Sequence, residues 1–439
     1  MRGGVLCVAV ALLAAGRAWA QTDVPPDADE AADEAANDSP GYTPPAEGPG
    51  APPPLTINGY VDVGFAKAQG NGTSFAPGDG RVPADYGVDP FAPAVNARGD
   101  VASTDAGGRF VNGFLPRSAG IGGNASFLLN TLDVDLKYTA ATAPLMVFSR
   151  VQLLPRFTGG GDDTRLYVEQ AFGRFVPFES QELALSVGKF DSVFGIEYLD
   201  NQANIRTGVT PSLVARYTTG QSIGAKLFYR IQLPAIWSAV SLNVAATNSG
   251  TFVEALQPPD ASLTGAPVGS ARLGYELNAA AVQVKLGASG MFGPRNDQPQ
   301  QAVHQRAFGL DARVAFRGLY LSAEYVRVDE GEGGPKTTSQ GSFPIASGFW
   351  VRGGYAQVAY AFPWSAGLLH KLTVYGRYDR RHAWFQGFTP ITVDRFTGGL
   401  RFELWDSVLL KAEYVANREL AGAPTVANNV FTSSLVYSF

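Results

Sequence analysis

Most of this 439-residue chain alternates polar and apolar residues with a period of two, and breaks of two different lengths separate the alternating runs. Short breaks, such as Arg317-Gly318, alternate along the chain with long ones, such as residues 329–347. Successive side chains of a β-strand point to opposite faces, so a period of two predicts strands with one apolar face. Regular alternation of short and long connections is typical of strands that run up and down in a closed ring.

Counting the runs on this rule predicts sixteen antiparallel strands. They are expected near residues 55–68, 124–139, 144–157, 164–177, 182–191, 215–232, 238–248, 270–278, 281–293, 305–316, 319–329, 349–362, 370–380, 392–404, 408–418 and 428–439. An even number brings both ends of the sheet to the rim that carries the short turns.

The two faces of the predicted strands differ sharply in polarity. In the run 370–380, Leu372 and Val374 alternate with Thr373 and Arg377. One such strand could face a protein core, but sixteen of them, with no helical pattern to cover the sheet, need an apolar solvent outside. The sequence therefore predicts an all-β, transmembrane antiparallel barrel whose polar faces line a lumen. Aromatic residues near strand ends, such as Trp237, fit the girdle at the depth of lipid headgroups.

The N-terminal residues predict export. Arg2 precedes an apolar run from Val5 to Ala15, and Ala18-Trp19-Ala20 is a small-x-small cleavage site. We expect residues 1–20 to be a cleaved signal peptide, residues 21–54 a disordered, acidic, Pro-rich linker, and residues 55–439 the barrel.

Charge and cysteine content exclude several functional classes. The net charge is −5, but eight acids precede residue 50, so the remainder is close to neutral and nothing favours nucleic acid as a partner. The single cysteine, Cys7, lies in the expected signal peptide. The mature chain is therefore expected to have neither a disulfide nor a thiolate metal site.

The last predicted strand carries apolar and aromatic residues on one face and ends on an aromatic residue. These residues are Phe431, Leu435, Tyr437 and Phe439. The pattern resembles the terminal signature of bacterial outer-membrane barrels. That resemblance implies recognition by the barrel-assembly machinery and a location in the cell outer membrane.

A second resemblance concerns the segment Val187-Gly188-Lys189-Phe190-Asp191-Ser192-Val193-Phe194-Gly195-Ile196-Glu197. It is similar to the strand-to-loop segment of the phosphate-selective porins O and P and of a related β-barrel porin family. The similarity continues into Ser222–Lys226 and the run Asn243–Asn248. The resemblance implies sixteen strands, a homotrimer, and a third external loop, here about residues 191–214, that folds into the lumen.

A lumen this wide leaves an aqueous channel, whose selectivity depends on the charges at its narrowest point. The candidate constriction residues are four on the third loop and four on the facing wall. They are Asp191, Glu197, Asp200 and Arg206, facing Arg150, Arg216, Lys226 and Arg230. Acids opposite bases would favour small polar solutes of either sign. Each residue could equally be a solvated side chain, and Glu197 could pair with Arg206 to hold the loop.

The sequence thus predicts a porin for passive diffusion of small hydrophilic solutes or ions, in contact with outer-membrane lipid and lipopolysaccharide. The alternative is a surface adhesin or receptor. The feature that supports this alternative is the long segment 69–123. The three histidines, His304, His370 and His382, have no metal-ligand spacing, and His382 near Asp379 and Asp394 is a weak catalytic candidate. No cofactor, metal or enzymatic activity is expected.

Overall fold

The computed structural model describes residues 54–68, 125–140, 143–153, 166–178, 182–191, 193–248, 267–279, 281–294, 304–331, 335–338, 341–344, 349–362, 367–385, 390–405, 407–420 and 429–439. All of them belong to one compact unit, Tyr42–Phe439. The expected signal peptide, most of the expected linker and the segment 69–123 lie outside the described residues.

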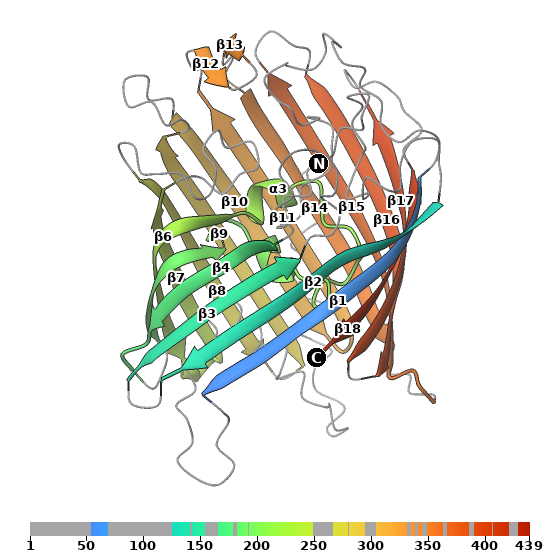
Figure 1. The fold of residues 1–439 in the computed structure, drawn as a ribbon, viewed down its shortest axis with the longest axis horizontal. Helices are drawn as coiled ribbons and strands as arrows, with labels where there is room; N and C mark the ends of the chain where they lie inside the picture. Colours follow the sequence, from blue (N-terminus) through green and yellow to red (C-terminus); the bar gives the residue numbers. More distant parts are fainter. Residues whose placement is uncertain are drawn as a thin grey trace. The chain divides into compact units, whose positions relative to one another are not determined.

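Sixteen strands form one closed antiparallel barrel (Figure 1). They are β1 (Leu55–Ala68), β2 (Ala125–Thr139), β3 (Leu145–Leu153), β4 (Leu166–Phe175), β5 (Leu183–Asp191), β6 (Gln221–Leu233), β7 (Ser238–Thr247), β8 (Val268–Ala279), β9 (Val282–Pro294), β10 (His304–Phe316), β11 (Leu319–Glu330), β14 (Phe349–Phe362), β15 (Lys371–Phe385), β16 (Ile391–Trp405), β17 (Val408–Glu419) and β18 (Val430–Ser438). Each pairs with its neighbours along the chain, and β1 pairs with both β2 and β18. A separate hairpin, β12 (Pro335–Thr338) and β13 (Gly341–Pro344), lies in the connection between β11 and β14.

The prediction of a sixteen-stranded antiparallel barrel is confirmed, and most bounds agree within a few residues. The sixth strand is the clearest difference, because it was expected from residue 215 and begins at Gln221. Residues Ala215–Thr218 instead form one helical turn, α3. Val214, Tyr217 and Thr218 are buried together there, which a strand with alternating faces would not allow.

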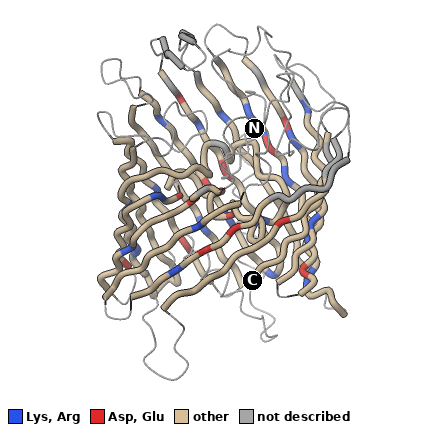
Figure 2. Tube along the Cα trace, in the orientation of Figure 1, with Lys and Arg blue, Asp and Glu red and all other residues tan. Residues whose placement is uncertain are grey.

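Side chains alternate between the two faces of the wall as expected. On β15, Val374 points outward and is exposed, whereas Thr373 and Tyr375 point inward and are buried. Many large apolar and aromatic side chains are exposed, among them Phe362 and Trp405 at strand ends and Trp237 in the turn before β7. Charged residues lie along the strands throughout the ring (Figure 2). The expected girdle residue Trp364 lies outside the described part of the chain.

The connections differ between the two rims. At one rim the turns are short, and a turn of two residues, Arg317 (φ 47°) and Gly318 (φ 80°), joins β10 to β11. Two successive positive φ values make a type I′ hairpin turn, which matches the twist of the strands and favours glycine at its second position. Most connections at the other rim are longer. Except for the segment between β5 and β6, they lie mostly outside the described residues.

The segment between β5 and β6 does not stay at the rim. Residues 193–220, called the lumen segment below, contain the 3₁₀ turn η2 (Glu197–Asp200) and α3. Its hydrogen bonds end on inward-facing side chains of β1, β9, β10, β11, β15, β16 and β17. Strands that far apart in the ring share a partner only across the lumen, so this segment crosses the inside of the barrel (Figure 1).

The closure between β1 and β18 generates the first prediction. The backbone N–H of Gly59 donates to the Phe439 carbonyl (3.0 Å), and the Phe439 N–H donates to the Gly59 carbonyl (2.9 Å). Deleting Phe439 removes both bonds and the ring that covers Gly59. We expect the refolded deletion variant to change from the mobility of the folded barrel to that of the unfolded chain at a lower temperature than the parent protein, as seen by gel electrophoresis after heating. Phe439→Leu keeps both bonds and is the control. An unchanged transition after the deletion would contradict this role.

Candidate functional site

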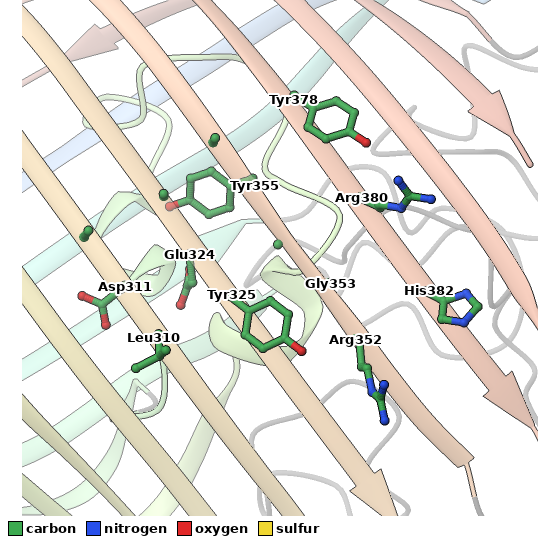
Figure 3. Close-up of a pocket in the computed structure, with 14 residues that line it drawn as sticks. Leu310, Asp311, Glu324, Tyr325, Arg352, Gly353, Tyr355, Tyr378, Arg380 and His382 are labelled. Carbon is green, nitrogen blue, oxygen red and sulfur yellow. The ribbon is translucent and has the colours of Figure 1, made fainter. Parts of the chain in front are cut away.

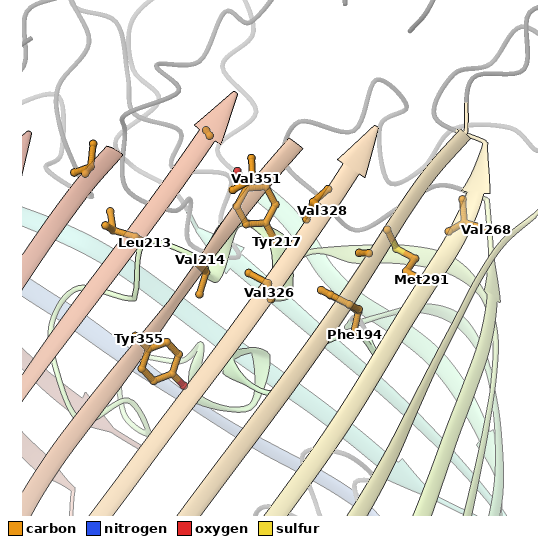
Figure 4. Packing of buried hydrophobic residues seen from close by; sticks show 13 residues of the cluster. Phe194, Leu213, Val214, Tyr217, Val268, Met291, Val326, Val328, Val351 and Tyr355 are labelled. Carbon is orange, nitrogen blue, oxygen red and sulfur yellow. The ribbon is translucent and has the colours of Figure 1, made fainter. Parts of the chain in front are cut away.

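The lumen segment is held by an apolar contact on one side of the barrel. Phe194, Leu213, Val214 and Tyr217 are buried in one cluster with wall residues (Figure 4). The wall members are Val268, Met291, Ala307, Val326, Val328, Val351, Tyr355, Ala383 and Val393, from β8 to β16. An aqueous lumen would favour polar residues at these inward positions. Their apolar character follows from the segment that covers them.

Three wall carboxylates accept hydrogen bonds from the backbone of the lumen segment. Glu413 on β17 accepts from the Val209 N–H (2.8 Å) and from both donors of Thr210. Asp379 on β15 accepts from the Leu213 N–H (3.1 Å). Glu324 on β11 accepts from the Ile196 N–H (2.8 Å). Each of these bonds satisfies a backbone donor of the segment inside the barrel, so these acids fix the segment's path.

Wall bases bind the carbonyls of the same segment. Arg377 on β15 donates to the carbonyls of Thr210 and Pro211, each at 2.8 Å. Lys411 on β17 donates to three carbonyls, those of Ala203, Arg206 and Gly208. Arg401 on β16 donates to the Ile205 carbonyl (3.1 Å). These charges are engaged by backbone groups of the lumen segment.

Two glycines allow the segment to approach the wall closely. Gly195 has φ +82°, and a Cβ there would collide with Glu324 and Thr218. A Cβ on Gly208 would lie 2.6 Å from the Glu413 carboxylate. Both positions therefore need glycine, one for its backbone conformation and both for space.

The predicted loop residues play different parts. Glu197 is buried and accepts from the Ser212 N–H (2.7 Å) and the Ser212 hydroxyl. Arg206, only 7% exposed, donates to the carbonyls of Asn201 (3.2 Å) and Val209 (2.6 Å). Both side chains thus hold the segment's own shape.

Asp200 is the predicted loop residue most open to the lumen. It forms an ion pair with Arg313 on β10 at 2.6 Å, and the two side chains are 35% and 18% exposed. Acid and base therefore meet at the accessible edge of the segment.

Asp191, Arg150 and Lys226 belong to a polar cluster on β2–β6. Arg150 pairs with Asp135 (2.7 Å), and its guanidinium also faces the Gln202 amide of the lumen segment. Asp191 accepts from Gln170 (2.7 Å) and Gln221 (3.2 Å). Lys226 lies over the Phe190 ring.

The remaining two candidates are separate from this cluster. Arg230 pairs with Glu276 (2.6 Å) nearer the short-turn rim, and Lys285 lies 3.8 Å from the same carboxylate. The side chain of Arg216 lies outside the described residues, although its backbone is part of α3. The seven predicted residues whose side chains are described therefore do not form one constellation.

The anchoring residues Glu413, Asp379, Arg377, Glu324, Lys411 and Arg313 were not among the predicted site residues. A signal for them exists in the sequence, because Arg377, Asp379 and Arg381 occupy alternate positions on the inward face of one strand. What the sequence does not give is the partner, since Arg377 and Asp379 bond to backbone groups 166 to 167 residues away and Glu413 to one 204 residues away.

Of the weak catalytic candidate, His382 and Asp379 do not come together. His382 and Asp379 are separated by three positions on β15, so they lie on opposite faces of the wall. His382 Nδ1 lies 2.8 Å from the Thr392 hydroxyl on the outer face. Within the described residues, no group of three His, Cys, Asp or Glu side chains could hold a metal ion. The described chain also has no helix long and apolar enough to cross a membrane.

The Glu413 anchor predicts a protease phenotype. Glu413→Ala leaves the donors of Val209, Thr210 and Tyr375 without their acceptor, and each unpaired buried donor costs about 1–3 kcal/mol. We expect trypsin to cleave after Arg206 at least about tenfold faster than in the parent barrel. Glu413→Gln keeps a carbonyl acceptor and should be cut more slowly than Glu413→Ala. Equal resistance of the parent and Glu413→Ala would show that the anchor is dispensable.

Glu197 predicts a pH dependence. Burial raises the pKa of the Glu197 carboxyl, while Arg377 and the Ser212 donors oppose that shift. A raised pKa in the attached segment means that this group stabilises attachment most at low pH, and that the contribution is lost as pH rises through the raised pKa. We expect the Ser212 amide, corrected for intrinsic exchange, to lose protection as pH rises. Glu197→Gln should remove this dependence. The same pH profile in both proteins would contradict the assignment.

Comparison with solved structures identifies the fold. A scan against protein-family models finds no match, and a search of curated proteins finds no similar sequence. The structure of Salmonella typhi OmpF in complex with daunomycin is similar with a TM-score of 0.51 and 11% identity, over 88% of this chain and 97% of that chain. The outer membrane channel DcaP of Acinetobacter baumannii gives 0.50 and 12%, with coverage of 88% and 97%. The chain therefore shares the fold of these solved structures.

Proposed function

We propose that this protein is an outer-membrane porin that lets small hydrophilic solutes and ions diffuse passively through its lumen. The observation that carries the proposal is a closed ring with an apolar outer face, a charged inner face and a segment attached across the inside. A barrel of this size encloses water unless something fills it, and an attached segment narrows it.

The apolar outer face supports a location in the membrane. Closing the sheet leaves no unpaired strand edge, which a chain in lipid requires. The short-turn rim would face the periplasm and the long-loop rim the cell surface, as in other bacterial barrels. In this orientation β1 begins and β18 ends at the periplasmic rim.

The accessible inward charges support a pore with weak ion preference. Each of three accessible acids is close to at least one base: Asp200 to Arg313, Glu276 to Arg230 and Lys285, and Glu403 to Lys371 and Arg401. Acids and bases so interleaved create local fields of both signs. The family resemblance would suggest strong phosphate selectivity. These residues contain no concentrated cationic site that would support it.

The ion pair Asp200–Arg313 gives the sharpest test of the channel. In planar bilayers the purified protein should give stepwise conductance. In a salt gradient, Arg313→Gln should raise the cation-to-anion permeability ratio and Asp200→Asn should lower it, each by about twofold. The double variant should return close to the parent ratio.

The control is Arg306→Gln, because Arg306 points outward and should leave the ratio unchanged. Absence of conductance steps would refute the porin proposal. Conductance with unchanged ratios in both single variants would mean that the Asp200 pair does not line the path. The homotrimer implied by the family resemblance stays a prediction, which native mass spectrometry of the same sample can test.

A further inference from the structure

The outer face of the barrel contains a hollow of about 670 Å³ across β10, β11, β14 and β15 (Figure 3). Its floor is made of small outward residues, among them Ala323, Gly354 and Ala356. Cross-strand pairing places Gly354 beside Tyr325 and Ala356 beside Tyr378, so two aromatic rings flank the small residues. The hollow is thus a built feature of the wall, made by small side chains between large ones.

Basic residues gather at the end of this hollow nearer the long-loop rim. Arg327 on β11 is directly opposite Arg352 on β14, and Arg352 is directly opposite His382 on β15. Arg380 lies one step further toward the middle of the wall, opposite Gly354. Like charges directly opposite each other destabilise a sheet. This arrangement therefore costs stability unless an anion binds there.

Acids of the chain balance this charge only in part. Arg327 is bonded to Asp329 (2.8 Å), and Arg306 lies 3.8 Å from the same carboxylate. Arg380 lies 3.6 Å from Asp394. Arg352 packs over the Trp350 ring (4.9 Å) and makes no ion pair with a residue that the structure describes. A positive excess remains at the mouth of the hollow.

The depth of these residues indicates what surrounds them. Arg352 is near the start of β14, beside the stacked rings of Trp350 and Trp384 (6.3 Å). Tryptophan rings at strand ends mark the level of lipid headgroups. The hollow extends from this level to Ala356 and Tyr378, toward the hydrocarbon region. A ligand that fits both parts has an anionic head and an acyl chain.

We propose that this face binds one phosphorylated glycolipid of the outer leaflet, a lipid A molecule. Its phosphate would be held by Arg352 and Arg380, and one acyl chain would occupy the hollow between Tyr325 and Tyr378. Arginine suits this role because its planar guanidinium binds phosphate bidentately. The choice of lipid A rests on the proposed function, since that function places the long-loop rim in the outer leaflet.

The test uses the full-length barrel in detergent, with lipid binding measured by native mass spectrometry. Lipid A should bind in preference to its dephosphorylated form and to phosphatidylethanolamine. Arg352→Gln/Arg380→Gln should weaken lipid A binding at least about tenfold, since two charge-assisted contacts are lost. Arg317→Gln is the matched control, because Arg317 lies in the short turn at the opposite rim and should not affect binding.

A second variant tests the hollow. Ala356→Trp fills it while leaving both arginines, and it should also weaken lipid A binding; Ala356→Leu serves the same purpose if the larger residue impairs folding. Unchanged binding in the arginine double variant, or equal binding of dephosphorylated lipid A, would overturn the proposal. Full displacement of lipid A by inorganic phosphate would reduce the site to an anion site and also overturn it. A change in oligomeric state in Ala356→Trp, with lipid A binding intact, would assign the hollow to contact between copies instead.

Failure of this site can be distinguished from failure of the porin proposal. The arginine double variant should keep the parent conductance, because both side chains point away from the lumen. Specific lipid A binding by a barrel without conductance steps would support the site and refute the channel. Conductance steps with no lipid A preference would support the channel and refute the lipid site.

Discussion

The closure of the sheet between β1 and β18 is the constraint on which the rest of the structure depends. With nine residue pairs between these two strands, the first and last strands leave no edge. Every strand of the ring then has a neighbour on both sides, so the wall can stand in an apolar solvent without exposing backbone donors. Closure also separates two environments, and the alternation of side chains follows from it.

Many charged side chains of the inner wall bind the backbone of the lumen segment and hold it in place. Glu413, Asp379 and Glu324 accept backbone N–H groups of the lumen segment, while Arg377 and Lys411 donate to its carbonyls. A buried charge is tolerated only where partners replace its hydration. Here the partners are backbone dipoles of a segment that has little regular structure of its own. The wall and the segment therefore satisfy each other, and neither has its observed form alone.

The barrel could be predicted from sequence because period two and turn length are local properties. The same reasoning placed Arg377 and Asp379 on the inward face of β15. It missed their role, because the N–H groups and carbonyls that they bind carry no sequence signal. It also took residues 215–220 for strand, since burial of Val214 and Tyr217 depends on a distant wall. Arg206 shows the same limit, because a base in an inward loop could serve the pore or the loop's own carbonyls.

At two places the wall departs from the rule that inward side chains are polar and outward ones apolar, and both departures have a common explanation. Inward apolar residues such as Val326 and Val351 violate the rule for an aqueous lumen, and Phe194, Val214 and Tyr217 cover them. Outward arginines such as Arg352 and Arg380 violate the rule for an apolar exterior, and acids of the described chain balance their charge only in part. A residue that disagrees with its environment costs free energy unless a partner changes that environment. For the inner patch the partner is part of the chain, so the outer row by the same logic indicates a partner from the surrounding membrane.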